Sequence, residues 1–478
     1  MSVRNIGYEH KTSLNQGFIC PVGIWEALPG DDIRHKTDVL LRTQALQAPV
    51  FHSAEVKYHT FFVPARLCWD DFDKFITGGE DGLDASVPPF IDVGSGGLAT
   101  GSLGHRLELP NTTFDETVSA LPYRAYGLIY NEFYRDQDLQ DPVVVSTAGG
   151  EDTTTNTDLK RACWQKDYFT TCRPDTQKGD DVQISLTGDA PIKSDTDLSG
   201  NRDINVDTAG DGQVSVHPGG QTDRELYADL SDVSAIDINS LRLAAALQRY
   251  KENMLRFGSR YTERLQAAFG VPNSDARLQR PEYLGGGKNV IQFSEIIQSA
   301  PSIDDVSAES VGSLKGHGIT VLKENKYRRK IPEYGFIITL MIVRPKTAYQ
   351  QGIHRMWSRD TKEEYFQPEL QHIGMQQVKN KELKADHATP NGLFGFQNRY
   401  DEYRHRFDVV SGELADTLDY WHMARQYASD PALNASFVEC EGVDRPFSSA
   451  ADEFVARIFH RVKAKNSKVS STGKPYVF

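Results

Sequence analysis

Cysteine is scarce in this chain, and long apolar runs are missing from it. The 478 residues include 5 cysteines (20, 68, 163, 172 and 440), with no C-x-x-C pair and no zinc-like cluster with histidine. An odd number of cysteines is typical of buried thiols in a reducing compartment. No stretch of about 18 apolar residues could span a membrane, and the polar opening lacks the apolar core of an export signal.

A basic excess is also missing. The 66 acidic residues outnumber the 53 basic ones, for a net charge of -13. This balance excludes a generally basic nucleic-acid coat, so contact with nucleic acid would depend on local patches. The 39% of hydrophobic residues suffice for a core, and the 38 glycines and 22 prolines indicate many loops. The length suggests two or three domains, although one large β-sandwich with long insertions remains open.

Catalytic motifs are missing as well. The 13 histidines form no H-E-x-x-H or H-x-H pair, and no G-x-S-x-G occurs. Residues 283–289 resemble a phosphate loop but lack its spacing, and Asn289 follows Lys288 where a hydroxyl is needed. The acids at 70, 71 and 73 are more typical of loop caps than of a metal site. We therefore expect no enzyme activity and no cofactor.

Two segments predict buried strands. Residues 56–63 begin with polar–apolar alternation and become wholly apolar before Pro64. Residues 335–343 are β-branched and almost wholly apolar, which predicts a central strand buried on both faces. Few strands alternate with helices, so an antiparallel sandwich is favoured over a doubly wound parallel sheet.

Helix and loop signals interrupt this pattern. Apolar residues recur every three or four positions over 239–269, which predicts an amphipathic helix that covers a sheet or, alternatively, pairs with a partner helix. Residues 78–104 are glycine-rich and predict a long loop. Residues 121–143 place tyrosines and Phe133 at helical spacing before a polar end, which predicts a docking element.

Several motifs along the chain occur in the order of one known family. They are WEALPGD (25–31), FFVPARLCWD (61–70), DARLQRPEYLGG (275–286), YQQG (349–352), RMWSR (355–359), RYDEYR (399–404), LDYWHMAR (418–425) and VDR (443–445), together with 121–143. In this the chain resembles the major capsid protein of microviruses, the small tailless single-stranded-DNA phages, in particular the gokushovirus-like branch. The region after Gly188 and the C-terminus depart from the family pattern.

The resemblance implies a fold and a function. It implies a mainly β, antiparallel jelly-roll β-sandwich over residues 1–478, with long loop and helical insertions. It implies a homo-oligomeric T=1 icosahedral shell around circular single-stranded DNA, assembled in the bacterial cytoplasm and found in the virion. A small basic DNA-associated protein and a pilot protein are expected partners, and no membrane insertion is expected.

Residues 188–232 are strongly acidic and cannot bury enough apolar surface to fold alone. Within them, 204–206 and 214–216 flank a glycine-rich turn and predict a hairpin. By resemblance this insertion projects from the particle at threefold axes, and we expect it to contact a host receptor. The alternative is a loop without a partner. The candidate contact residues are Asp203, Asp207, Asp211 and Asp223.

Residues 461–478 have the opposite charge and predict a basic C-terminal arm. Lysines of such an arm neutralise phosphate without reading sequence, although a solvated tail is the alternative. The candidate DNA-contacting residues are Arg461, Lys463, Lys465, Lys468 and Lys474. The basic cluster at 323–330 is a second, weaker candidate, with an ordinary surface face as its alternative.

Arginine and aromatic residues are favoured at interface centres, so runs that combine them predict subunit contacts; a role inside the subunit's own core is the alternative for each. The candidates are Tyr126, Tyr130, Phe133, Arg135, Asp136, Arg355, Trp357, Arg359, Tyr403, Arg404, Trp421 and Arg425. A monomeric carbohydrate-binding β-sandwich is the competing class of function, and the motif order favours the shell subunit.

Overall fold

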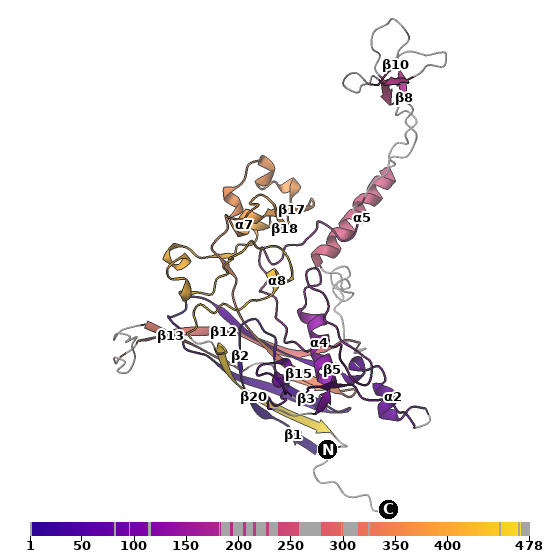
Figure 1. Ribbon diagram of the computed structural model, residues 1–478, viewed down its shortest axis with the longest axis vertical. Coiled ribbons are helices and arrows are strands. Elements are labelled where there is room, and N and C mark those ends of the chain that lie inside the picture. Colours follow the sequence, from indigo (N-terminus) through magenta and orange to yellow (C-terminus); the bar gives the residue numbers. More distant parts are fainter. Residues whose placement is uncertain are drawn as a thin grey trace, which may run out of the picture. The chain divides into compact units, whose positions relative to one another are not determined.

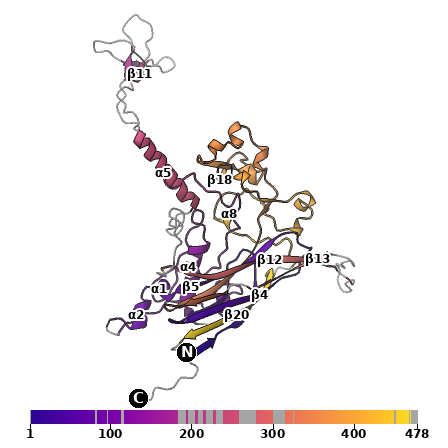
Figure 2. The same ribbon diagram turned by 180° about the vertical axis from the view of Figure 1, so that it is seen from behind.

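The computed structural model is divided into two compact units, Met1–Asp175 with Pro272–Phe478 and Thr176–Val271; Figures 1 and 2 show the chain from opposite sides. The structure describes residues 2–466 and 469, except 81–82, 95, 113–115, 181, 183–191, 195–203, 207–213, 217–225, 229–237, 258–278, 298, 300–313, 324–325 and 449–450.

The first unit is built on one antiparallel sheet, which is 10-stranded among the described residues. Its order is β1-β20-β4-β13-β12-β5-β15-β3, with β2 beside β20 and β14 beside β4. The strands are β1 (Ser2–Asn5), β2 (Tyr8–Leu14), β3 (Cys20–Ala27), β4 (Asp32–Thr43), β5 (Ala54–Pro64), β12 (Glu282–Ile297), β13 (Leu314–Leu322), β14 (Tyr327–Lys330), β15 (Gly335–Pro345) and β20 (Phe454–Asn466). The prediction of a mainly β, antiparallel fold is confirmed, and the jelly-roll order of connections stays a prediction.

The sheet curls so that its two ends pack on each other. Ile33 of β4 and Val462 of β20 share a buried cluster with Phe62 of β5 and Ile337 of β15, although these strand pairs are not neighbours in the sheet. A second, larger cluster between the same strands contains Val39, Val56 and Ile458. Burial of apolar side chains between the two layers is therefore the main force that closes the sandwich.

The strand predicted as central lies between β5 and β3. Ile337 of β15 packs into the cluster between the layers, and Ile338 packs into a cluster on the opposite face. That opposite face is covered by α4 (Leu121–Ile129), which Figure 1 shows beside the sheet, and by the π-helical turn η1 (Tyr130–Tyr134). Burial on both faces explains why the strand has no polar alternation.

Short elements form the rest of the first unit. They are α1 (Ala65–Cys68), α2 (Phe72–Thr77), β6 (Phe90–Asp92), α3 (Leu103–Arg106), β7 (Thr117–Ser119), β16 (Ala348–Tyr349), η2 (Arg355–Trp357), η3 (Lys362–Glu364), η4 (Pro368–Leu370), β17 (Met375–Lys379), α7 (Asn380–Leu383), β18 (Leu393–Asn398), η5 (Asp401–Tyr403), β19 (Asp408–Val409), η6 (Gly412–Ala415), η7 (Asp419–Trp421) and α8 (Ala435–Val438). The predicted loop at 78–104 is thus wrong in part, because β6 pairs with β7 and α3 buries Leu103.

The described residues of the second unit form two strand pairs and one helix. Antiparallel β9 (Ile204–Val206) and β10 (Val214–Val216) confirm the predicted hairpin pairing, and β8 (Ile192–Ser194) pairs with β11 (Leu226–Ala228). Helix α5 (Ile238–Phe257) matches the first part of the helix predicted over 239–269, and residues 258–269 lie outside the described part of the chain.

Candidate functional site

The tyrosines of residues 121–143 point into the subunit that carries them. Tyr126 is 2% exposed, and its hydroxyl donates to the Ile19 carbonyl at 2.9 Å and accepts from the Lys160 N–H at 3.0 Å. Tyr130 is 4% exposed and packs with Tyr126 in the apolar cluster between α4 and the sheet. Their own sheet covers Tyr126 and Tyr130, which supports the alternative of a role inside the subunit's own core, and their contact with a neighbouring subunit stays a prediction.

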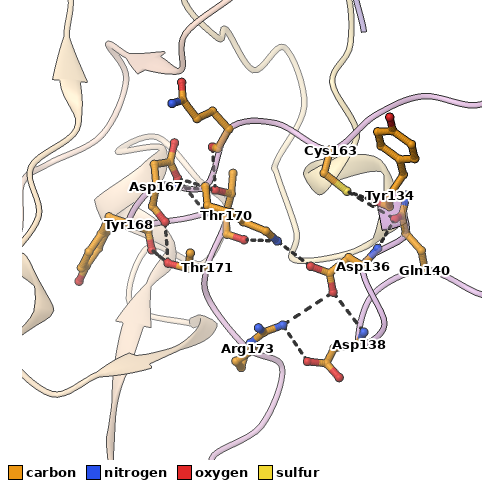
Figure 3. A network of polar contacts seen from close by, with 12 residues as sticks. Tyr134, Asp136, Asp138, Gln140, Cys163, Asp167, Tyr168, Thr170, Thr171 and Arg173 are labelled. Carbon is orange, nitrogen blue, oxygen red and sulfur yellow. Dashed lines mark hydrogen bonds and ion pairs between the residues drawn. The ribbon is translucent and has the colours of Figure 1, made fainter. Parts of the chain in front are cut away.

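The polar end of this segment is also bound within the chain (Figure 3). The Asp136 carboxylate lies 2.7 Å from Lys166 Nζ and 3.7 Å from an Arg173 nitrogen, and Arg173 also contacts Asp138 at 2.7 Å. Burial alone would raise the pKa of Asp136, but the two cations hold it below its ordinary value. Asp136 therefore joins two segments of one subunit, and its predicted contact with a neighbouring subunit stays a prediction.

Phe133 and Arg135 keep part of their surface. The Phe133 ring lies 4.8 Å from the Phe61 ring, and Arg135 donates to the Gln140 carbonyl at 2.7 Å. Both side chains are partly exposed. Contact of these two residues with a neighbouring subunit stays a prediction.

Arg355 and Arg359 form ion pairs with buried carboxylates of the same subunit. Arg355 lies 3.3 Å from Glu382 and 3.7 Å from Glu402, and Arg359 contacts Glu402 at 3.3 Å. These carboxylates are buried, and burial raises the pKa of Glu382 although the Arg355 cation opposes it. The arginines thus fix the loops that carry them.

Aromatic residues on these loops face outward. We call Trp357, Tyr365, Phe366 and Tyr403 the aromatic patch; Trp357 is 76% and Tyr403 50% exposed. The Arg359 guanidinium lies 4.6 Å from the Tyr403 ring centre and 5.3 Å from that of Tyr365. Phe366 packs edge-on against Tyr403 at 5.9 Å. Tyr365, Phe366 and Tyr403 are thus held by contacts with Arg359 and with one another while their surface stays exposed. The sequence predictions missed Tyr365 and Phe366 because no arginine adjoins them in the chain.

An exposed phenylalanine and a partly buried tryptophan form a stacked aromatic pair on the first unit. The rings of Phe51 and Trp421 are stacked, with centres 5.6 Å apart and planes 7° apart. The Phe51 N–H donates to the Trp421 carbonyl at 2.8 Å, and Phe51 is 72% exposed. Trp421 is therefore joined to a residue that sequence reasoning did not single out.

Arg425 is buried rather than presented to a neighbour. Its guanidinium lies 4.3 Å from the Phe437 ring centre and 4.9 Å from that of Trp164, and it donates to the Phe437 carbonyl. This burial supports the alternative of a role inside the subunit's own core, and contact of Arg425 with a neighbouring subunit stays a prediction. Arg404 is exposed, lies 3.8 Å from Asp401 and remains a candidate.

Three of the predicted DNA-contacting residues lie on a strand. Along β20 every second side chain is buried, and Arg461, Lys463 and Lys465 occupy the exposed positions. The basic arm predicted from residue 461 is wrong up to residue 466, because Val462 and Ala464 fill the core and hold the strand in the sheet. Lys468 and Lys474 lie outside the described residues.

The structure brings the second basic cluster to the same place. Strand β14, which carries Arg328 and Lys330, pairs with β4, and β4 pairs with β20. Arg34 of β4 lies directly between Arg328 and Lys463 in register. Two clusters far apart in sequence therefore form one surface, which we call the basic face.

The candidate host-contacting residues Asp203, Asp207, Asp211 and Asp223 lie outside the described residues. Their flanking strands β9 and β10 are paired, as are β8 and β11.

Neither a metal site nor a phosphate loop is formed by the residues that the structure describes. No group of three or more His, Cys, Asp or Glu there could hold a metal ion, and no described helix is long and apolar enough to cross a membrane. The phosphate-loop-like residues 283–289 form part of β12. A side chain at Gly286 would lie 2.6 Å from the Tyr58 carbonyl, so this glycine serves close packing of strands.

Comparison with known proteins identifies the family to which the chain belongs. A family model described as capsid protein (F protein) matches residues 2–469. The chain is 34% identical to capsid protein VP1 of Bdellovibrio phage phiMH2K, with 88% of this chain and 84% of the relative aligned. It is 31% identical to VP1 of Chlamydia phage 1 (91% and 88% aligned) and 31% identical to VP1 of Spiroplasma virus 4 (93% and 89%). The chain therefore belongs to the capsid protein (F protein) family of microviruses, as a structural component of the virion.

Proposed function

We propose that this subunit assembles into a T=1 icosahedral shell in which the aromatic patch contacts a neighbouring copy. The observation that supports this most is the exposure of Trp357 beside loops already braced by buried ion pairs. A rigid aromatic surface loses little conformational entropy on binding, and such residues dominate interface energies. Closed symmetry repeats each contact around the shell.

The test is assembly of a Trp357→Ala variant. We expect its urea unfolding midpoint to equal that of the parent, because Trp357 is 76% exposed. Loss of an interface hot spot weakens each contact by about 2 kcal/mol or more, so the yield of particles in electron micrographs and size exclusion should fall sharply. Val144→Ala, an exposed apolar position outside the patch, is the matched control.

The patch contact and the shell itself are tested by different outcomes. Normal particle yield from the Trp357 variant would show that the patch is not an interface. A parent protein that stays monomeric under all assembly conditions would overturn the shell itself.

We further propose that the shell forms in the bacterial cytoplasm and encloses circular single-stranded DNA, with the basic face turned toward the nucleic acid. Its cations lie on three paired strands, which supports contact along a phosphate backbone. A small basic protein and a pilot protein are proposed to accompany the DNA. Binding of an oligonucleotide that is insensitive to salt would contradict this role.

The acidic insertion at 188–232 is proposed to contact the host surface. Its paired strands β8–β11 and β9–β10 support a folded projection. Deletion of residues 195–225 should leave particles intact and reduce adsorption to host cells. Unchanged adsorption by intact particles would remove the host-contact proposal.

A further inference from the structure

A pocket of about 450 Å³ opens on the basic face between β1, β4, β14 and β20. Its volume falls in the range of roughly 300–1,000 Å³ typical of small-ligand sites. Six cationic residues contribute to its lining: Arg34, Lys36, Lys326, Arg328, Arg461 and Lys463.

The strand register explains why these cations converge. Arg328 of β14 is paired with Arg34 of β4, Arg34 with Lys463 of β20, and Lys463 with Asn5 of β1. Residues directly opposite each other on antiparallel strands extend from the same face of the sheet. The four side chains therefore form a row across the face of the sheet, with three positive charges and the amide of Asn5.

Acidic residues neutralise only part of this charge. Asp32 contacts Arg328 at 2.6 Å, and Asp38 contacts both Arg461 at 2.9 Å and Lys36 at 3.3 Å, so these two carboxylates serve three of the six cations. The structure shows no acidic partner for Lys463 within the described residues. A surplus of positive charge in a concave site attracts anions and raises their local concentration.

An exposed aromatic ring adjoins the pocket. Phe459 is 40% exposed and precedes Arg461 by two positions on β20, so both extend from the same face of the strand. The Arg461 guanidinium lies 5.3 Å from the Phe459 ring centre. A flat ring and a guanidinium beside a cationic groove are the elements that proteins use to stack and hold single-stranded bases.

We propose that the pocket and Phe459 together bind one nucleotide unit of single-stranded nucleic acid, with its phosphate against Arg34 and Lys463 and its base stacked on Phe459. The inference rests on the proposed contact of the basic face with DNA and adds that this contact depends on the base. Bases of a duplex are already paired and stacked, so the site selects single strands.

The test measures binding of the full-length protein to three labelled probes by fluorescence anisotropy. The probes are a short oligothymidylate, an abasic oligomer of the same length and charge, and a duplex of that length. We expect the oligothymidylate to bind about tenfold more tightly than the abasic oligomer, since a base that stacks on an aromatic side chain strengthens binding by about that factor or more. Equal binding of these two oligomers, or tighter binding of the duplex, would overturn the proposal.

Two matched pairs of variants locate the site. Phe459→Ala should remove the difference between the oligothymidylate and the abasic oligomer, whereas Val455→Ala, at a 45% exposed position on the same face, should preserve it. Lys463→Gln should weaken all single-stranded binding more than Lys465→Gln, which removes the same charge beyond the pocket. Equal losses within either pair would contradict the assignment.

Failure of this inference can be told from failure of the shell function. Particle formation is measured separately by electron microscopy. Intact particles from a protein that binds no oligomer would overturn the nucleotide site and leave the shell. Base-dependent binding by a protein that never assembles would support the site and overturn the shell.

Discussion

His35 and His460 lie in hydrogen-bond contact inside the sandwich, with 3.2 Å between His35 Nε2 and His460 Nδ1. His460 Nε2 lies 2.8 Å from the Val22 carbonyl, which can only accept, so Nε2 carries the proton and Nδ1 is the acceptor. Burial lowers the pKa of both rings, so both are neutral near pH 7. In this neutral pair His35 Nε2 donates to His460 Nδ1, Thr37 Oγ1 lies 3.0 Å from the same His35 nitrogen, and His35 Nδ1 has no partner within the described residues.

We predict that the subunit loses stability as the pH falls through the range of these histidines. Burial lowers the pKa of His35 to about 3 and that of His460 to about 4, against 6.5 for an ordinary histidine. Between about pH 6.5 and 4 the unfolded chain therefore binds more protons, so the free energy of unfolding falls by up to about 1.4 kcal/mol per pH unit for each histidine. Urea unfolding midpoints across this range measure the slope. His460→Gln should flatten it, and the exposed His372→Gln should not.

A side chain at Gly23 is predicted to destabilise the subunit. A Cβ at this position would lie 2.5 Å from His460 Nε2, in the closely packed layer between the strands. We expect Gly23→Ala to lower the free energy of unfolding by about 1–3 kcal/mol, the usual effect of overpacking a core. Gly96→Ala is the control, because no atom lies within 4 Å of its added methyl group. An unchanged thermal midpoint for the Gly23 variant would show that His460 can move aside.

Loss of one partner of the buried ion pair of Arg124 and Asp152 is predicted to destabilise the subunit strongly. The two side chains lie 2.7 Å apart and are almost fully buried, and Asp152 also accepts from the Thr155 hydroxyl at 2.6 Å. Asp152→Asn leaves Arg124 uncompensated and should lower the free energy of unfolding by about 3–5 kcal/mol. Asp71→Asn, which breaks the exposed pair with Lys74, should change it by less than about 1 kcal/mol. Similar urea midpoints for both variants would contradict the prediction.

The Arg124–Asp152 pair makes the free energy of unfolding depend on pH in a separate range. Burial would raise the pKa of Asp152, but Thr155 and Arg124 lower it to about 2, against an ordinary value of 3.8. The carboxylate therefore contributes stability above about pH 3.8 that is lost as the pH falls toward 2. This loss lies at lower pH than that of the histidines, so acid titration of unfolding should show two separate ranges.

The sequence was most informative where burial imposes a repeating pattern. The alternation at 56–63 and the apolar run at 335–343 correctly indicated β5 and β15, because a half-buried strand and a fully buried strand need different residues. The pairing of 204–206 with 214–216 followed from the glycine-rich turn between them.

Two features needed the structure. The alternation of β20 is present in the sequence, but its exposed lysines look like a basic tail, and partner strands far away in the chain decide that it is a strand. The stripe that contains Tyr126 predicted a docking helix correctly. An apolar stripe is equally stable against its own sheet or another subunit, so spacing alone could not name the surface it covers.

The late position of β20 affects how a subunit is made. Its core residues Phe454 and Ile458 complete the layer against β4, whose register runs from residue 32 with 465 to residue 43 with 454. On a ribosome, β4 emerges early and must wait for this partner until nearly all the intervening chain has been translated. The sandwich can therefore close only after β20 itself has been synthesised, which delays the appearance of assembly-competent subunits and leaves shorter nascent chains without a finished core.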